Sequence, residues 1–238
     1  MGRSMPIKAV FFDAAGTLIT PVQPVGQTYT LLAKSYGMEV SSLEISQRFR
    51  ACFGASPPLT FGPVSRDSIE QLERDWWKKL VHCVFEPLGP FEQFDRFFSE
   101  LFSYFARAEA WALYPDVLKT LSALQERGLA LDVISNFDSR LVDILEGLGM
   151  NGCFEEVFIS SRVGHAKPAR QIFETALRRH NLAPSEAMHV GDSEENDLYG
   201  AVNAGMMGVL IDRSAKRPST SYRRIQSLNE IIPILDQV

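Results

Sequence analysis

Four polar clusters in this 238-residue sequence each follow a short apolar run, and together they hold the residue types that phosphoryl transfer needs. The first apolar run ends on Asp13, within "FFDAAGTL". The residues that follow later runs are Ser135 with Asn136, Lys167, and the acids of "GDSEEND", which are Asp192, Glu194, Glu195 and Asp197. Each cluster alone has an ordinary explanation as a helix cap, a turn or a surface charge. Because they recur together, we interpret them as one site.

The chemistry that these residue types suggest begins with a carboxylate nucleophile. A carboxylate can attack phosphorus to give an acyl-phosphate, which water then hydrolyses. Such a carboxylate repels a phosphate dianion, and Mg²⁺ held by carboxylates and substrate oxygens would offset that repulsion. A lysine and a serine hydroxyl would supply further compensation. The sequence therefore predicts magnesium-dependent phosphoryl transfer.

The elements that must position these residues alternate between strand and helix. Buried parallel strands are predicted where the apolar runs lie, at residues 7–12, 129–135, 155–159, 187–190 and 206–211. Helical patterns lie between the later runs, at residues 116–127, 139–147, 169–180 and 195–204. This alternation predicts an α/β fold with a doubly wound parallel sheet. Ligands bind at the carboxyl ends of the strands in such sheets, where the polar clusters stand.

The segment from about Pro21 to Trp111 differs, because it is predicted to be helical throughout and to contain no strand. It would form an all-helical cap domain of residues 21–111, inserted into a core domain of residues 1–20 and 112–238. The loop "GASPPLTFGP" (54–63) divides it in two. Aromatic residues recur at helical spacing in "FDRFFSELFSYF", which we interpret as packing in a small bundle rather than as a ligand pocket. The junctions near 20–24 and 112–115 would act as hinges.

Composition is that of an ordinary globular protein, with 45% hydrophobic and 22% charged residues. A formal charge of −5 argues against nucleic-acid binding, and the basic segment 213–224 is predicted to be a solvated loop. The cysteines Cys52, Cys83 and Cys153 are predicted to be reduced structural thiols, which favours a cytoplasmic location. We expect no membrane span and no secretory signal. A small phosphorylated molecule is the predicted partner, and the oligomeric state is left open.

Four motifs, in order along the chain, resemble those of the haloacid dehalogenase superfamily. The first family motif is hhhDxDxT, where h is apolar, and here it reads "VFFDAAGTL". An apolar strand that ends in a hydroxyl residue is "LDVISN", and a lysine followed by proline occurs in "VGHAKPAR". The GDxxxxD motif is "VGDSEEND". The resemblance covers Ile7 to about Asp212, and it implies a Rossmann-like core with a cap placed after the first motif.

The resemblance also implies a role for each matching residue. Asp13 would be the nucleophile and a magnesium ligand, and the backbone carbonyl of Ala15 would reach the same metal. Ser135 would hydrogen-bond the phosphate together with the backbone at Asn136. Lys167 would neutralise Asp13 and the phosphoryl group. Asp192 would bind magnesium directly, whereas Asp197 would either bind it or hold its waters.

The sequence departs from the family pattern at Ala15. In the family's phosphatases a second aspartate stands there, which protonates the leaving group and later activates water. Alternate residues of an extended segment share a face, so that aspartate would lie beside Asp13. A positioned acid–base contributes roughly 10²- to 10⁴-fold to the rate. Ala15 therefore removes a substantial part of the expected catalysis.

Three explanations of Ala15 are compatible with the sequence: a phosphatase that is weak or uses another acid, carbon-halogen or carbon-phosphorus cleavage, and phosphate binding without turnover. Family members that release halide lose the GD of the fourth motif, which this chain keeps at Gly191 and Asp192. Members that cleave phosphonates use a desolvated cap lysine, whereas Lys34, Lys78 and Lys79 stand in polar surroundings. Cap arginines Arg48 and Arg50 could bind an anionic group or face solvent.

The segments "PVGQTYTLLAKSYG" and "ISNFDSRLVDILEGLG" resemble one branch of the superfamily whose members also lack the second aspartate. That likeness implies no particular substrate. We interpret the chain as a magnesium-dependent phosphatase of small phosphorylated metabolites, with the other two explanations kept open. Three further polar residues receive structural predictions: Asp138 caps a helix, His165 lies on the surface, and His189 packs against a neighbouring strand.

Overall fold

The central feature is a sheet of six parallel strands in a computed structural model that describes residues 6–215 and 222–237. Its strands are β1 (Ala9–Phe12), β4 (Ala130–Ser135), β5 (Glu156–Ile159), β6 (Ala187–Gly191), β7 (Met207–Ile211) and β8 (Arg224–Ile225). Their spatial order is β5-β4-β1-β6-β7-β8. The five predicted strands are confirmed, whereas β8 is too short for an apolar run to reveal it. Strand β1 lies between β4 and β6, and the later strands are added on one side of it as β4 and β5 and on the other side as β6, β7 and β8. Ligands bind beside such a switch point.

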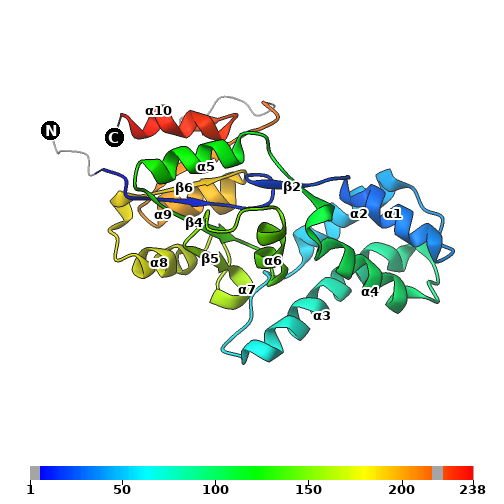
Figure 1. Ribbon diagram of the computed structural model, residues 1–238. Helices are drawn as coiled ribbons and strands as arrows, with labels where there is room; N and C mark the ends of the chain where they lie inside the picture. The colour runs from blue at the N-terminus through cyan, green and yellow to red at the C-terminus, as the bar shows by residue number, and fades with distance from the viewer. Residues whose placement is uncertain (1–5, 216–221, 238) are drawn as a thin grey trace.

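Helices cover both faces of this sheet, as Figure 1 shows. One face carries α5 (Val117–Glu126), α6 (Arg140–Gly147) and α10 (Ile231–Leu235), and the other carries α8 (Arg170–Arg179) and α9 (Gly200–Asn203). Strand β1 supplies both faces, because Val10 and Phe12 pack in one apolar cluster and Ala9 and Phe11 in the other. Burial on both faces explains why the strands are continuous apolar runs. The predicted doubly wound α/β fold is confirmed.

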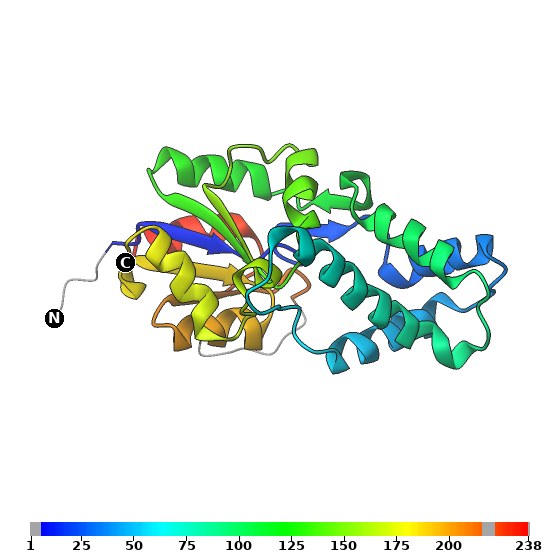
Figure 2. The same ribbon diagram turned by 90° about the horizontal axis from the view of Figure 1, so that it is seen from below.

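Four further helices lie together beyond the edge of the sheet where its strands end (Figure 2). They are α1 (Val25–Ser35), α2 (Ser42–Ala55), α3 (Arg66–Phe85) and α4 (Phe94–Phe105). These helices enclose a separate apolar cluster that includes Tyr29, Ile45, Phe85 and Phe97. The predicted packing of the α4 aromatic face into a bundle core is confirmed by Phe97 and Phe98, which are buried there. The assignment of residues 21–111 as a cap domain stays a prediction.

Both chain crossings between the sheet and these helices are joined in a small second sheet. Strand β2 (Ile19–Pro21) pairs with β3 (Trp111–Leu113) in antiparallel register. The prediction that no strand would occur between Pro21 and Trp111 is therefore wrong at the two ends of that segment. Three-residue strands show no periodicity, and their pairing depends on segments that lie far apart in the sequence.

Several short helical turns complete the fold. A four-residue helix, α7 (Ser160–Val163), follows β5, and a π-helical turn, Glu194–Tyr199, precedes α9. The predicted helix at 195–204 is thus divided between the π-helical turn and α9. Short 3₁₀ turns occur at Glu86–Leu88, Ala108–Ala110, Pro184–Glu186 and Leu228–Glu230.

The cysteines correct one prediction. Cys52 of α2 and Cys83 of α3 form a disulfide, whereas Cys153 is free. The expectation of reduced thiols is therefore wrong for Cys52 and Cys83, because the fold brings together two residues that are 31 apart in the sequence. The argument for a reduced compartment loses this support, and the cytoplasmic location stays a prediction.

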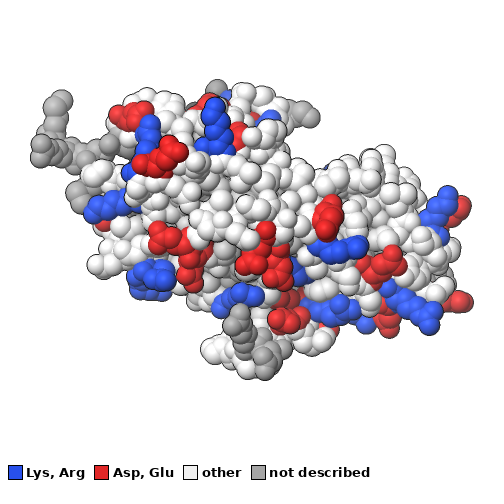
Figure 3. All heavy atoms as spheres, viewed as in Figure 1, with Lys and Arg blue, Asp and Glu red and all other residues white. Residues whose placement is uncertain are grey.

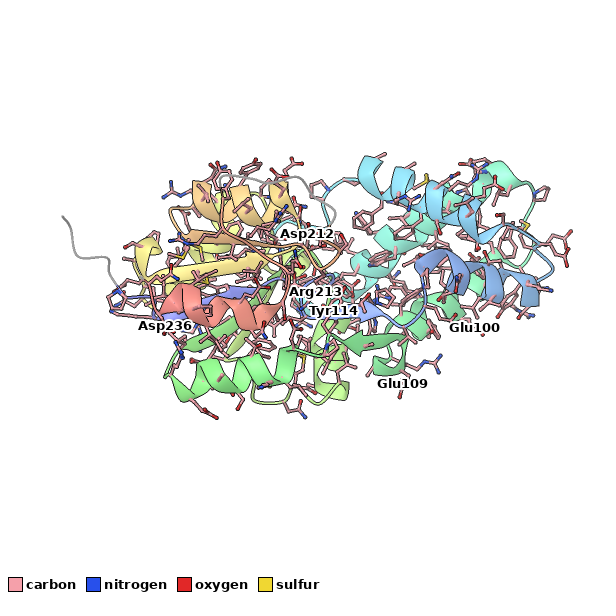
Figure 4. All side chains as sticks on the ribbon, turned by 90° about the horizontal axis from the view of Figure 1, so that it is seen from above. Glu100, Glu109, Tyr114, Asp212, Arg213 and Asp236 are labelled. Carbon is pink, nitrogen blue, oxygen red and sulfur yellow. A yellow bond between two sulfur atoms is a disulfide. The ribbon has the colours of Figure 1, made fainter. Side chains whose placement is uncertain are left out.

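The basic segment 213–224 is only partly described, since residues 216–221 lie outside the described ranges. Arg213 is not a solvated side chain as predicted. Its guanidinium lies 3.8 Å from the ring centroid of Tyr114 and forms an ion pair with Asp116 at 3.1 Å (Figure 4). On the face shown in Figure 3, acidic and basic side chains are interspersed rather than separated into patches of one sign. Among the described helices, none combines the length and the apolar character that crossing a bilayer requires.

Candidate active site

Asp13 lies at the carboxyl end of β1, where the sheet holds it from both sides. Its backbone N–H donates to the Val190 carbonyl of β6 at 2.9 Å. Its Oδ1 accepts a hydrogen bond from the Ser135 hydroxyl of β4 at 3.1 Å. The side chain is buried, and burial raises the pKa of Asp13 although Lys167 acts in the opposite direction. The end of a buried strand thus carries a carboxylate that two neighbouring strands orient.

Lys167 connects this carboxylate to a second one. Its Nζ donates to Asp13 Oδ1 at 2.7 Å, to Asp197 Oδ1 at 2.5 Å and to the Ile134 carbonyl at 2.7 Å. Three acceptors match the three protons of an ammonium group. Burial alone would lower the pKa of Lys167, but Asp13 and Asp197 outweigh it and hold that pKa above its usual value. Lys167 is therefore a buried permanent cation.

The backbone of Lys167 is fixed by Asn136, which follows β4. The Asn136 side-chain amide donates to the Lys167 carbonyl at 2.8 Å, and the Lys167 N–H donates to Asn136 Oδ1 at 2.8 Å. This pair of hydrogen bonds ties the loop after β5 to the end of β4. The polar residues that follow two different strands in the sequence are thereby brought to the same site.

Asp197 lies in the π-helical turn after β6 and has both oxygens engaged. Oδ1 accepts from Lys167 and lies 3.0 Å from His189 Nε2, and Oδ2 accepts from the Ser193 N–H at 2.9 Å. Burial opposes ionisation, but Lys167 and His189 hold the pKa of Asp197 well below its usual range. Gly191 permits this approach, since a Cβ there would lie 2.1 Å from Asp197 Cγ.

His189 contributes to the site in a way that its sequence context did not predict. It is fully buried in β6, as expected, with its ring 5.2 Å from the Phe173 ring. Because a carboxylate only accepts, Nε2 carries the proton that is shared with Asp197. Burial lowers the pKa of His189, which keeps the ring neutral. Strand alternation places His189 and Gly191 on the same side of β6, and that pattern could have indicated its proximity to Asp197.

Three carboxylates meet at this site and could hold a metal. One oxygen from each of Asp13, Asp192 and Asp197 lies within 4.8 Å of the others. Gly16 allows Asp192 to approach, because a Cβ at that position would lie 2.4 Å from Asp192 Oδ2 and its φ is +91°. The three acids supply carboxylate oxygens beside the ammonium group of Lys167. An all-oxygen donor set suits Mg²⁺, and the residues present fit that ion.

In this structure neither Ala15 nor Asp138 can act as the acid that protonates the leaving group. Ala15 is half-buried and lines the cavity beside the carboxylates with a methyl group. Asp138 is fully buried, and both of its oxygens accept hydrogen bonds: Oδ2 from Trp77 at 2.5 Å, and Oδ1 from the Arg140 N–H at 3.0 Å. The Arg140 side chain also pairs with it, at 2.6 Å. Asp138 therefore contacts the start of α6, but the prediction that it caps this helix is wrong, because Ser139 is the N-cap residue and no side-chain cap hydrogen bond is formed there.

A cavity of about 620 Å³ lies between the loops at the carboxyl ends of the strands and helices α1 to α4, with Lys167 of the buried cluster in its lining. At one end Ala15, Asn136 and Lys167 line it. At the other end the walls are aromatic rings of α2, α3 and α4, including Phe53, Trp77 and Phe102. The aromatic face of α4 therefore packs in the bundle core, as predicted, and Phe98 and Phe102 also line this cavity.

Helix α3 closes one side of this cavity through polar contacts to the core, which we call the α3–core contact. Glu73 Oε1 accepts from the Ser139 N–H at 3.0 Å, from the Ser139 hydroxyl at 2.9 Å and from the Ser161 hydroxyl at 2.5 Å. Trp77 adds its hydrogen bond to Asp138. Burial raises the pKa of Glu73, although the serine donors oppose this effect. No sequence pattern indicated that these residues would meet.

Of the other candidate side chains, only Glu195 lines the cavity among the described residues. Lys34, Lys78, Lys79, Arg48 and Arg50 are absent from its lining, and His165 is exposed as predicted. Lys78 pairs with Asp95 at 2.8 Å and Arg48 with Glu44 at 2.9 Å. Of the acids in "GDSEEND", Glu194 accepts from the Tyr199 hydroxyl at 2.7 Å, and Glu195 lines the cavity with an exposed side chain.

Comparison with known proteins gives the site a context. The sequence model of the haloacid dehalogenase-like hydrolases matches residues 7–205. The mouse (Mus musculus) protein named haloacid dehalogenase-like hydrolase domain-containing protein 3 is 34% identical, over 99% of this chain and 96% of its own length.

Two solved structures are similar over nearly their whole length. A HAD phosphatase from Thermococcus onnurineus is 28% identical with a TM-score of 0.67, over 96% of this chain and 98% of its own. A 2-haloacid dehalogenase from Pseudomonas syringae is 22% identical with a TM-score of 0.67, over 97% of this chain and 99% of its own, which shows a shared fold alone.

Proposed function

The chain belongs to the haloacid dehalogenase-like hydrolases, and from that premise we propose that it is a magnesium-dependent phosphatase of small phosphorylated metabolites, with Asp13 as the nucleophile. The observation that carries the proposal is the buried cluster in which Lys167 bridges Asp13 and Asp197 while Ser135 orients Asp13. A nucleophilic carboxylate, a phosphate-binding hydroxyl and a fixed cation are the groups that an acyl-phosphate route requires.

In the proposed reaction Ser135 and Lys167 both hold Oδ1 of Asp13, and Oδ2 attacks phosphorus. As the phosphoryl group enters, the Ser135 hydroxyl turns from Asp13 Oδ1 to a phosphoryl oxygen, and the charge of Lys167 offsets that of the phosphoryl group. Water then hydrolyses the acyl-phosphate on Asp13. Asp13, the Ala15 carbonyl and Asp192 would hold Mg²⁺, whose charge offsets repulsion between the phosphate and the carboxylates. The full engagement of Asp197 by Lys167, His189 and Ser193 supports an outer role for this residue, in which it holds the waters of the metal.

Ala15 favours a second candidate function, a phosphate-binding protein without turnover. The methyl group at that position offers no proton, and Asp138 is engaged by Trp77 and Arg140. Carbon–halogen or carbon–phosphorus cleavage receives less support. The Asp192 and Asp197 carboxylates suit a metal, which halide release by family members does not use, and no cap lysine lines the cavity for phosphonate cleavage.

Phosphate release from a panel of phosphomonoesters, with and without Mg²⁺, tests the proposal. We expect magnesium-dependent release by the wild type and its loss in Asp13→Asn, which keeps the side-chain shape but removes the nucleophile. Asp143→Asn, an exposed acid on α6, is the matched control and should retain wild-type rates. If neither the wild type nor Asp13→Asn released phosphate from any ester, the proposed phosphatase activity would be wrong. Halide release from 2-haloacids would instead indicate carbon–halogen cleavage.

A further inference from the structure

We propose that the substrate is a phosphate monoester of a flat, uncharged aromatic alcohol, whose ring lies between the cap helices while its phosphate lies against Asp13 and Lys167. The inference rests on the proposed function for the identity of the phosphate, and on the cavity walls for the rest of the molecule. The cavity of about 620 Å³ is far larger than a phosphate group and lies in the range of about 300–1,000 Å³ typical of small-molecule sites.

The walls that face away from the carboxylates are aromatic. They include Phe49 and Phe53 of α2, Trp76 and Trp77 of α3, and Phe98 and Phe102 of α4. The Phe53 ring contacts those of Phe49, Trp76 and Trp77, with centroids 5.7, 6.1 and 6.3 Å away. Phe53 nevertheless stays 47% exposed, so apolar surface is left uncovered at a site built of rings. A bound aromatic ring would cover it by the same offset and edge contacts.

Three polar groups of these walls, from Ser56, Trp76 and Trp77, are already hydrogen-bonded within the protein. The Trp76 indole N–H donates to the Pro57 carbonyl at 2.9 Å, and the Trp77 N–H donates to Asp138. The Ser56 hydroxyl donates to the Cys52 carbonyl at 2.8 Å. A sugar or polyol would need hydrogen-bond donors, but these side chains already use theirs in hydrogen bonds to other protein groups. The walls therefore present ring faces rather than donors.

Charge on the lining residues argues against a second anionic group on the substrate. Lys167 is paired with Asp13 and Asp197, and Arg140 is paired with Asp138 and lies 3.9 Å from the Phe102 ring centroid. Glu195 places a negative charge on the lining. Burial raises the pKa of Tyr29, another lining residue, so its phenol stays uncharged. Both basic side chains among the described lining residues, Arg140 and Lys167, are thus paired with carboxylates, so these residues offer no unpaired cation to a carboxylate or second phosphate.

Ala15 leads to the same class of substrate by an independent route. In the proposed reaction Asp13 Oδ2 bonds to phosphorus as the phosphorus–oxygen bond to the leaving group breaks, and that oxygen departs with the electron pair. Water then attacks the acyl-phosphate, which restores the Asp13 carboxylate and gives inorganic phosphate, and the departed oxygen takes a proton from solvent. A phenol has a pKa of about 10, whereas water, to which an alkyl alcohol is comparable, is near 15.7. Only the phenol-type leaving group departs readily without an acid.

Three phosphate esters separate recognition of the ring from ease of departure. Phenyl phosphate has a ring and a good leaving group, benzyl phosphate has a ring and a poor one, and glycerol phosphate has neither. For the wild type we expect turnover of phenyl phosphate to exceed that of benzyl phosphate by about 10²-fold or more, the size of the missing acid contribution. Calorimetric binding to Asp13→Asn, where nothing is hydrolysed, should give a roughly 10- to 100-fold lower Kd for benzyl phosphate than for glycerol phosphate.

Phe53→Ala tests the wall directly, because an exposed ring can be removed without emptying the core. It should weaken benzyl phosphate binding about tenfold and leave glycerol phosphate binding unchanged. Leu43→Ala is the control, since Leu43 is 65% exposed on the same helix and does not line the cavity.

The outcomes distinguish this inference from the proposed function. If no ester is hydrolysed but Asp13→Asn still binds benzyl phosphate more tightly than glycerol phosphate, the proposed phosphatase activity is wrong and the proposed aromatic site is supported. If magnesium-dependent hydrolysis occurs but glycerol phosphate is bound and turned over to the same extent as the aromatic esters, the proposed aromatic site is wrong and the proposed phosphatase activity is supported. Equal effects of Phe53→Ala on both esters would also overturn the aromatic site.

Discussion

Ala15 is the single residue at which the site departs from the phosphatases it resembles. It lines the cavity beside Lys167, at a position where a longer side chain would enter the same space. An aspartate there would share the surroundings of Asp13 and could give a proton to the leaving group.

We therefore predict that Ala15→Asp accelerates the hydrolysis of benzyl phosphate by roughly 10²-fold or more, with little gain for phenyl phosphate. The reason is that only the alkoxide leaving group needs a proton. Steady-state phosphate release from both esters measures the effect, and Ala15→Asn controls for size without an ionisable proton. An equal gain for both esters would mean that the new carboxylate acts on something other than the leaving group.

At the residue scale the sequence was informative wherever a polar residue followed an apolar run. Asp13, Ser135, Lys167 and Asp197 were all placed at one rim by that pattern, and the structure brings them into contact. The contribution of His189 was less visible, because strand alternation shows on which side of β6 it lies but not whether it only packs there or also hydrogen-bonds to Asp197.

Among the elements, α2 and α3 are joined covalently and at the same time supply much of the aromatic wall. The Cys52–Cys83 disulfide closes a loop with a sequence separation of 31, and Cys83 is exposed. A closed loop of this length limits the unfolded chain and stabilises the fold by roughly 3–4 kcal/mol in the chain-entropy account.

Reduction, or the Cys83→Ser substitution, is therefore expected to lower the free energy of unfolding by up to that amount, and denaturant titration measures it. Cys153→Ser, which removes the free thiol, should leave the unfolding midpoint nearly unchanged. Thiol titration of unfolded, unreduced protein should find one reactive thiol, and three would contradict the disulfide.

Helix α5 is fixed to the C-terminal segment by the carboxylate at its start. Asp116 accepts from the Ser227 hydroxyl and the Leu228 N–H, both at 2.6 Å, and pairs with Arg213. Burial alone would raise the pKa of Asp116, but the Ser227, Arg213 and Leu228 donors outweigh it and hold that pKa below its usual value. Its contribution to stability is thus present above the unfolded pKa of about 3.9 and is lost as the pH falls through the folded pKa.

Asp116→Asn should consequently lower the free energy of unfolding by roughly 1.5 kcal/mol near pH 7, because hydrogen bonds to a charged acceptor are lost. The difference from the wild type should begin to shrink below about pH 4 and disappear once the pH has fallen below the folded pKa, where the wild-type carboxylate is also protonated. Denaturant titrations at several pH values measure this, with Asp143→Asn as the exposed control. A difference that does not change with pH would show that charge on Asp116 is unimportant.

Elements were predictable to the extent that they are long and buried. Five sheet strands follow from apolar runs because both of their faces are covered. Strands β2, β3 and β8 did not, because two or three residues cannot show a period and their pairing partners lie elsewhere in the chain. The disulfide was missed for a related reason: spacing along the sequence does not show which faces of α2 and α3 meet.

Across the whole molecule, the α3–core contact decides how the cap helices sit over the carboxylates. All three donors from Ser139 and Ser161 meet the same oxygen of Glu73, so glutamine could accept them and alanine could not. Residues 66 and 88 positions apart make this contact, which is why no local pattern revealed it.

We predict that Glu73→Ala accelerates amide hydrogen exchange at Ser139 by roughly 5- to 100-fold, because a buried donor that loses its acceptor forfeits about 1–3 kcal/mol. Glu73→Gln should stay close to the wild type. Exchange that is equally fast in both variants would mean that the charge of Glu73, rather than its hydrogen bonds, holds α3 against the core.

The pairing of β2 with β3 has a consequence for how such a protein can be rebuilt. Because the outgoing and returning strands are hydrogen-bonded neighbours, the segment that they bracket begins and ends about 5 Å apart. A different segment inserted between β2 and β3 would need only to span this short distance, as in other folds that tolerate inserted domains. We therefore expect that the segment between β2 and β3 can be exchanged for another, with the carboxylates and Lys167 left in place.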